Sequence, residues 1–219
     1  MVIRKIPKNH IHVTGRHAAQ KCKGDVDFES MLEAEHLLLL DHDPKVRSYD
    51  VQPVHIPVPG VLRGYVPDAL VEFHPDEDGV IASPELREVK STRDLQINEA
   101  KYAIKFEQAR KYCEYRGWFF RIITELEIRT PRLGNVKFLR AYEHQEHPHE
   151  MLCLVLARMA ELGSTNSLTL LKSISTDPDE QLNWMPVLWH LVATRQIDVD
   201  WDTAFGAVVA LWPVGVRHG

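Results

Sequence analysis

Residues 65–90 read YVPDALVEFHPDEDGVIASPELREVK, and this stretch decides the fold. The polar segment HPDEDG separates two runs with the composition of strands, which predicts two neighbouring strands joined by a hairpin. Side chains two residues apart on a strand share a face, so Glu88 and Lys90 point the same way. Asp68 stands on the first apolar run. Pairing of the strands would therefore bring two carboxylates and one ammonium group to one place.

These three side chains suit metal-assisted hydrolysis of a phosphodiester. Carboxylates at strand ends hold a hard cation such as Mg²⁺ through oxygen, and we expect Mn²⁺ to substitute, with one or two ions bound. Lys90 beside the metal would orient or deprotonate the attacking water, or stabilise charge on the phosphate. The same spacing also arises by chance, in which case Asp68 is a turn residue and Glu88 belongs to an ordinary charged strand end.

Composition places the chain among globular proteins. Of its 219 residues, 44% are hydrophobic and 26% are charged. No run approaches the roughly 20 apolar residues that a membrane span needs, and the N-terminus does not resemble a signal peptide. The three cysteines are far apart and form neither a disulfide framework nor a metal motif. We therefore expect a cytoplasmic protein without a membrane partner.

Charge is distributed unevenly along the chain. Residues 24–86 hold fourteen acidic and three basic side chains, whereas residues 87–140 hold thirteen basic and seven acidic ones. A basic block beside an acidic metal site suits the backbone of DNA. Candidate DNA-binding residues in this block are Arg93, Lys101 and Lys105. An ordinary solvated helix face would carry similar charge.

The chain is expected to have three parts. Residues 1–24 form a basic arm that lies along DNA or a partner, or has no role. Residues 25–145 form an α/β domain with a mixed sheet. Residues 146–219 contain three helical segments followed by a β wing, which predicts a small winged-helix-like domain. Its acidic character favours contact with a protein over contact with DNA.

Within the middle part, a helix over about residues 27–41 would be capped by Asp25 or Asp27. Glu33 falls in line with the leucines of this helix and therefore near its buried face. An acidic side chain at this position is either stabilised by the positive end of the helix dipole, or it is paired with a cation or bound to a metal.

Three strands are expected next, over residues 46–58 with a kink at Pro53, over 61–73 and over 85–90. A helix over 95–116 should follow and end at Gly117, with its inner side formed by Ala103, Ile104, Phe106, Ala109 and Cys113. The segment WFFRIITE is then expected to form a buried strand, and residues 128–140 an irregular connection.

The order of several motifs resembles that of the TnsA family, endonuclease subunits of heteromeric cut-and-paste transposases. The motifs are SMLEAEHLLLLDHDPKVRSYDVQP, GYVPDALVEF, REVK and YCEYRGWFFRIITE, and the likeness covers about residues 28–142. The resemblance implies a restriction-endonuclease-like core. It also implies catalytic roles for Glu33, Asp68, Glu88 and Lys90, with Glu33 as a third carboxylate on the metal side and the Val89 carbonyl as a metal ligand. Gln52 matches a family Gln-Pro motif without a firm role.

The resemblance further implies cleavage of double-stranded DNA at the 5′ ends of a mobile element. The implied partners are an integrase-type transposase that cuts and joins the 3′ ends, and an ATP-dependent regulator of transposition. Two alternatives stay open. The first is a free-standing restriction, repair or phage nuclease of the same fold. The second is a non-catalytic DNA-binding adaptor, which the intact set of charged residues disfavours.

Overall fold

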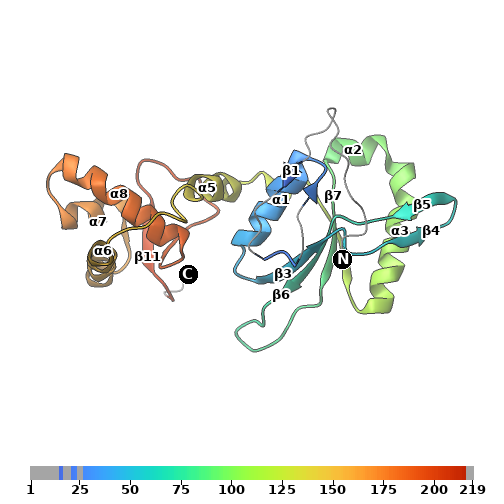
Figure 1. Ribbon diagram of the computed structural model, residues 1–219, viewed down its shortest axis with the longest axis horizontal. Helices are drawn as coiled ribbons and strands as arrows, with labels where there is room; N and C mark the ends of the chain where they lie inside the picture. The colour runs from blue at the N-terminus through green and yellow to red at the C-terminus, as the bar shows by residue number, and fades with distance from the viewer. Residues whose placement is uncertain (1–14, 17–20, 24–26, 216–219) are drawn as a thin grey trace. The chain divides into compact units, whose positions relative to one another are not determined.

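The computed structural model describes residues 15–16, 21–23 and 27–215, so most of the predicted basic arm lies outside the described residues. The chain divides into two compact units, Met1–Arg129 and Thr130–Gly219 (Figure 1). The division falls earlier than the boundary after residue 145 that the sequence suggested. Its physical reason is that helix α5 (Pro131–Leu139) packs against helix α8 (Pro178–Ala193), where the ring centroids of Phe138 and Trp189 lie 5.4 Å apart.

A four-stranded mixed sheet organises the first unit. Its strands lie in the order β3-β6-β7-β8; β6 is antiparallel to both β3 and β7, whereas β7 and β8 run parallel. Together with the flanking helices this confirms the predicted α/β, restriction-endonuclease-like core with a mixed sheet. The strand bounds are Val46–Val51 for β3, Ala69–Phe73 for β6, Glu85–Val89 for β7 and Phe119–Ile123 for β8. A separate antiparallel pair joins β1 (Gly15–Arg16) to β2 (Asp27–Phe28).

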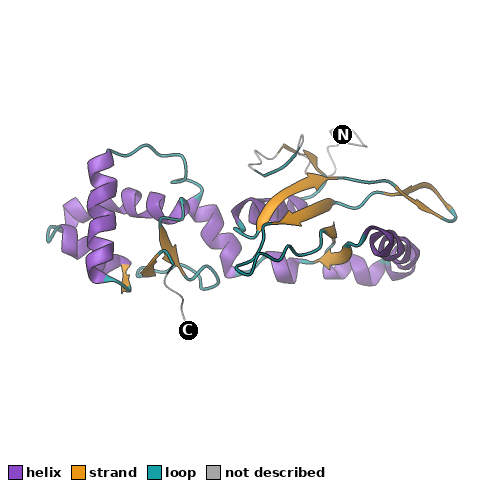
Figure 2. Ribbon diagram, turned by 90° about the horizontal axis from the view of Figure 1, so that it is seen from below, coloured by secondary structure: helices purple, strands orange, loops and turns teal. Residues whose placement is uncertain are grey.

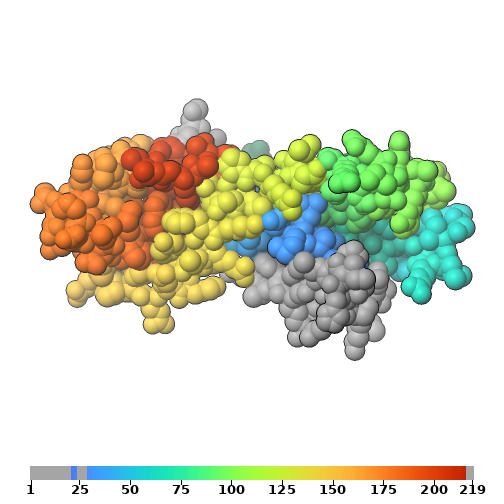
Figure 3. All heavy atoms as spheres, turned by 90° about the horizontal axis from the view of Figure 1, so that it is seen from above, coloured from blue at the N-terminus to red at the C-terminus, as the bar shows by residue number. Residues whose placement is uncertain are grey.

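Both faces of the sheet are covered. Helix α1 (Met31–His42) packs its leucines against β3 and β6 on one face. Helix α3 (Glu99–Arg116) covers the other face together with the hairpin of β4 (Ile56–Val58) and β5 (Val61–Tyr65). Consecutive β6 residues therefore enter different cores, Ala69 the first and Leu70 the second. Figure 3 shows α3 (green) and the hairpin (cyan) side by side on the surface.

Ser30, and not Asp25 or Asp27, caps helix α1. Its hydroxyl accepts a hydrogen bond from the Glu33 N–H at 3.2 Å, which satisfies one of the free donors at the helix start. The helix therefore begins later than the sequence suggested, because Ser30 supplies this cap and the chain immediately before it, at Asp27–Phe28, is extended as β2.

Two predicted strands are each broken in two. The strand expected over 46–58 divides because Gln52 has a φ of 49°, which turns the chain before Pro53 and sends β4 to pair with β5 instead of the main sheet. The strand expected over 61–73 divides before β6. Pro67 has no N–H to donate to a ladder, so the chain leaves β5 and re-enters the sheet at Asp68.

The long helix predicted over 95–116 is also broken, at Asn98, into α2 (Thr92–Ile97) and α3. Its apolar face is partly as predicted, since Phe106, Ala109 and Cys113 are buried. Ile104 and Ala103 face outward instead, and Tyr102 takes their place because residues 102, 106, 109 and 113 follow the helical repeat. Gly117 ends the helix in the left-handed conformation, as predicted.

Two expectations for the following segment were wrong. Strand β8 lies at the edge of the sheet and is not fully buried, with Phe119 63% exposed. The connection over 128–140 is helical instead of irregular: α4 (Glu125–Ile128) is followed by α5, which has Pro131 in its first turn, where a missing N–H costs no bond.

The second unit combines helices with a three-stranded antiparallel sheet in the order β10-β11-β9, consistent with the winged-helix-like prediction (Figure 2). Its core is formed by buried aliphatic side chains such as Leu170, Leu188 and Leu211. No helix among the described residues is long and apolar enough to span a membrane. The remaining bounds are α6 His149–Leu162, β9 Thr165–Asn166, α7 Ser167–Ile174, β10 Ile197–Val199 and β11 Ala210–Pro213.

The stability of the first unit should depend on the contact between β7 and α3. Leu86 is 0% exposed, whereas Leu62, on strand β5 of the β4–β5 hairpin, is 103% exposed. We expect Leu86→Ala to lower the free energy of unfolding by about 2–5 kcal/mol, because it leaves a cavity in the core. The matched change Leu62→Ala should alter it by less than about 0.5 kcal/mol. Urea denaturation followed by circular dichroism measures both, and similar losses in the two variants would contradict this packing.

Candidate active site

Asp68 is fixed where three strands meet. Its N–H donates to the Arg87 carbonyl on β7 at 3.1 Å, and its carbonyl accepts from the Gln52 N–H at the end of β3 at 2.9 Å. Its carboxylate accepts from the Val89 N–H, with 2.7 Å between nitrogen and Oδ2. Backbone groups of the neighbouring strands therefore hold both the main chain and the carboxylate of Asp68 in place.

The ammonium group of Lys90 lies among three oxygen atoms. Its Nζ is 2.9 Å from Glu88 Oε1, 2.9 Å from the Val89 carbonyl oxygen and 3.4 Å from Asp68 Oδ2. Burial lowers the pKa of Lys90, but the charges of Asp68 and Glu88 together outweigh it, so the net shift of this pKa is upward. The sequence prediction that Asp68, Glu88 and Lys90 meet at one place agrees with this arrangement.

Glu88 is a buried carboxylate with two different partners. Its side chain lies on β7 with 3% of the residue exposed; Oε1 faces Lys90, and Oε2 accepts a hydrogen bond from the Tyr65 hydroxyl at 2.7 Å. Burial, followed by the nearby charge of Asp68, raises its pKa to about 8, while Lys90 and Tyr65 oppose the shift. Positive charge at this place would therefore favour the ionised form of Glu88.

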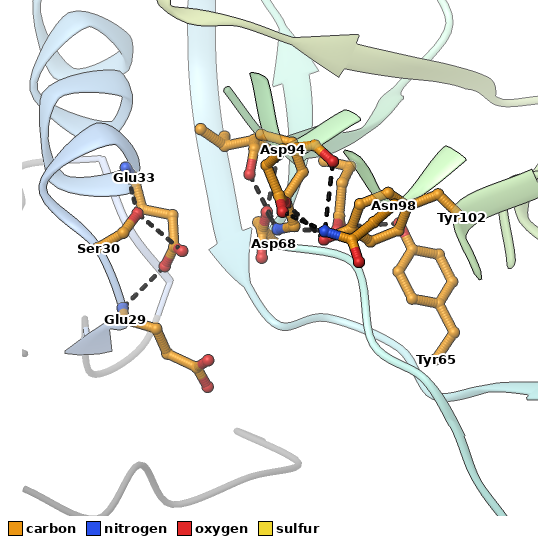
Figure 4. Close-up of polar contacts among 11 residues, drawn as sticks. Glu29, Ser30, Glu33, Tyr65, Asp68, Asp94, Asn98 and Tyr102 are labelled. Carbon is orange, nitrogen blue, oxygen red and sulfur yellow. Dashed lines mark hydrogen bonds and ion pairs between the residues drawn. The ribbon is translucent and has the colours of Figure 1, made fainter. Parts of the chain in front are cut away.

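Glu33 approaches the same place from helix α1. Its carboxylate accepts from the Ser30 hydroxyl at 3.0 Å and from the Glu29 N–H at 2.8 Å, a group of contacts apart from those of Asp68 in Figure 4. A small cavity is nevertheless lined by both Glu33 and Asp68, together with Val89 and His36. Burial and the charge of Asp68 raise the pKa of Glu33 to about 7.

The donor atoms fit a hard cation. Asp68, Glu88 and the Val89 carbonyl offer only oxygen, and all three already surround one positive charge, that of Lys90. Within the described part of the chain, no three side chains of His, Cys, Asp or Glu are grouped so that they could hold a metal by themselves. A main-chain carbonyl and water molecules would have to complete the ligand set, which is how Mg²⁺ is usually bound.

Sequence reasoning missed two residues that the fold brings to this site. His36, one turn after Glu33 on α1, is buried, and its Nε2 has no hydrogen-bond partner among the residues described. Burial, assisted by Arg87 and Arg121, lowers its pKa to about 3, so its ring is neutral. Its spacing from Glu33 could have indicated its place. Tyr65 could not have been found this way, because only the turn of the chain between β5 and β6 directs its hydroxyl to Glu88.

The candidate DNA-binding residues lie on the helices beside the site. Arg93 on α2 and Lys101 on α3 are exposed. Lys105 is half-buried, with its Nζ 5.9 Å from the centre of the Tyr65 ring, and Lys101 lies similarly over Tyr102. Lys105 on α3 is therefore connected to the site through Tyr65, whose hydroxyl contacts Glu88, whereas the hydroxyl of Tyr102 contacts Asp94.

Two protein-family models match the chain. The model described as TnsA-like endonuclease N terminal matches residues 43–125, and the one described as TnsA endonuclease C terminal matches residues 127–201. The first match contains Asp68, Glu88 and Lys90 and begins after Glu33. A comparison with curated proteins gave no match.

The raised pKa of Glu33 predicts a pH dependence of stability. Its folded-state pKa of about 7 exceeds its ordinary value of 4.5, so its contribution is fully present below pH 4.5 and is lost as the pH rises through 7. Glu33→Gln cannot ionise. The melting temperature of this variant relative to the unaltered protein should therefore rise between about pH 5 and pH 8 in chelator.

Calorimetric melting across this range measures the difference. Glu114→Gln, a matched change at an exposed position of α3, is the control and should show no such trend. A constant difference for Glu33→Gln would show that Glu33 ionises as it does in water.

Proposed function

Because the chain belongs to the TnsA endonuclease family, the endonuclease subunits of transposases, we propose that it cleaves the 5′ ends of a mobile element by Mg²⁺-dependent hydrolysis of the phosphodiester backbone. The observation that carries the proposal is the convergence of Asp68, Glu88 and the Val89 carbonyl on one positive charge. A structural ion pair needs one carboxylate, whereas two carboxylates and a directed carbonyl suit a divalent ion.

In this proposal Asp68, Glu88 and the Val89 carbonyl hold Mg²⁺, for which Mn²⁺ substitutes. A bound Mg²⁺ supplies positive charge to the phosphate oxygens and lowers the pKa of a coordinated water. Lys90, whose ammonium group lies 2.9 Å from Glu88 Oε1, stabilises negative charge on the phosphate. Glu33, which lines the same small cavity as Asp68, orients the attacking water and takes up its proton.

The DNA would lie along α2 and α3. Arg93, Lys101 and Lys105 would contact its phosphates, which fixes the position of the duplex without reading its sequence. Since such contacts release counterions, binding should weaken steeply as salt rises.

Partner proteins are assigned to the second unit. Residues 130–219 contain ten acidic and seven basic side chains, an unfavourable composition for gripping DNA. We assign this unit to contacts with an integrase-type transposase, which would cut and join the 3′ ends, and with an ATP-dependent regulator. The match of this unit to the C-terminal model of a transposon nuclease family supports the assignment over a free-standing nuclease.

The test is cleavage of an end-labelled plasmid that carries the element ends, in Mg²⁺, with and without the partner transposase. Asp68→Asn should reduce cleavage by more than about 100-fold, since loss of an outer-shell partner alone costs 10–100-fold. Asp78→Asn, the same change in the exposed 74–79 loop, should cleave normally.

Cuts at the 5′ ends that need both Asp68 and the partner would support the proposal. Cuts that need Asp68 but no partner would replace it with a free-standing nuclease. Equal activity of Asp68→Asn and the unaltered protein would remove the site assignment.

A further inference from the structure

The two oxygen atoms of Glu88 have separate tasks. Oε1 faces Lys90, the positive charge shared with Asp68 and the Val89 carbonyl, and Oε2 accepts from Tyr65 at 2.7 Å. A carboxylate can turn about its last bond, and at 3% exposure there is little water to pair with an oxygen that turns away. The hydroxyl of Tyr65 therefore fixes the orientation of the Glu88 carboxylate, so that its other oxygen faces the shared positive charge.

Tyr65 is itself held firmly enough for this task. It ends strand β5, where it pairs with Ile56 of β4, and its side chain is buried. Its ring contacts Phe106 of α3 at a centroid distance of 6.3 Å, and the Lys105 ammonium lies 5.9 Å from the ring centre. A tyrosine has only two side-chain torsions, so packing of the ring fixes its hydroxyl as well.

We propose that Tyr65 is a positioning residue that holds Glu88 in the orientation required to bind the divalent cation. This inference rests on the proposed function and adds to it a residue outside the Asp68, Glu88 and Lys90 set. Partners that orient a metal ligand typically change metal affinity or activity by 10–100-fold when they are removed. The Tyr65 hydroxyl contacts Glu88 directly, at Oε2, while the other carboxylate oxygen, Oε1, faces Lys90.

The structure offers a matched control. Tyr102 of α3 also donates its hydroxyl to a carboxylate, Asp94 Oδ2, at 2.6 Å (Figure 4). Its ring stacks on that of Phe106 with a centroid distance of 5.2 Å. Asp94 joins α2 to α3 and makes no hydrogen bond to Asp68, Glu88 or Lys90 that the structure shows. Tyr102→Phe therefore removes an equivalent buried hydrogen bond without touching Glu88.

The experiment titrates Mn²⁺ into the full-length protein by isothermal calorimetry and, separately, measures the Mn²⁺ concentration for half-maximal cleavage. Tyr65→Phe should raise both the Kd and the half-maximal concentration about 10-fold. Tyr102→Phe should leave both unchanged. An unchanged Kd in Tyr65→Phe, or an equal rise in both variants, would overturn the role of Tyr65.

A second comparison shows whether Tyr65 acts through Glu88. In a Glu88→Ala background, which leaves no unpaired carboxylate, adding Tyr65→Phe should not change the Kd further. A further 10-fold rise in the Kd in this background would mean that Tyr65 acts independently of Glu88 and would overturn the proposal. Absence of Mn²⁺ binding and of cleavage in the unaltered protein would instead contradict the proposed function itself.

Discussion

The buried carboxylate of Glu88, held between the Lys90 ammonium and the Tyr65 hydroxyl, is the contact on which the rest of the site depends. A buried charge is costly unless it is paired and hydrogen-bonded, so each partner must be delivered by the fold. Lys90 directly follows strand β7 and lies on the same side as Glu88, because side chains two residues apart share a face. Tyr65 comes from the end of β5 in the β4–β5 hairpin. Asp68 arrives from the next strand, anchored to the backbone on both sides of it. Two carboxylates and a carbonyl oxygen therefore surround one ammonium group, and further positive charge would be favourable at this place.

The sheet places the proposed cation site beside the proposed DNA-binding residues. Its two faces are packed by different elements, α1 on one side and α3 with the hairpin on the other. Glu33 comes from the first face and Tyr65 from the second, so the residues between them lie where β6 and β7 meet. The basic side chains of α3 stand on the second face, where Lys105 contacts the Tyr65 ring. The proposed phosphate contacts and the proposed cation site therefore lie next to each other.

Some of this arrangement follows from sequence and some does not. The grouping of Asp68, Glu88 and Lys90 could be predicted, because it needs only strand alternation and one hairpin. The breaks at Gln52 and Asn98 could not, because Gln52 has a positive φ, which residues other than glycine rarely adopt, and Asn98 ends a helix in the middle of a continuous helical pattern. The same holds for Glu33. Periodicity places it near a buried face, but its neighbour Asp68 comes from another part of the chain, so the helix alone could not distinguish an end-of-helix acid from a site residue.

The central claim is that the oxygen atoms around Lys90 form a divalent-cation site. Anomalous diffraction from crystals of the protein grown with Mn²⁺ tests it most directly. We expect a manganese peak in contact with the Asp68 and Glu88 carboxylates and the Val89 carbonyl, with the Lys90 ammonium displaced from at least one of them. A peak located elsewhere, or no peak while Lys90 keeps all three oxygen contacts, would show that the cluster is a structural ion-pair network and would contradict the claim.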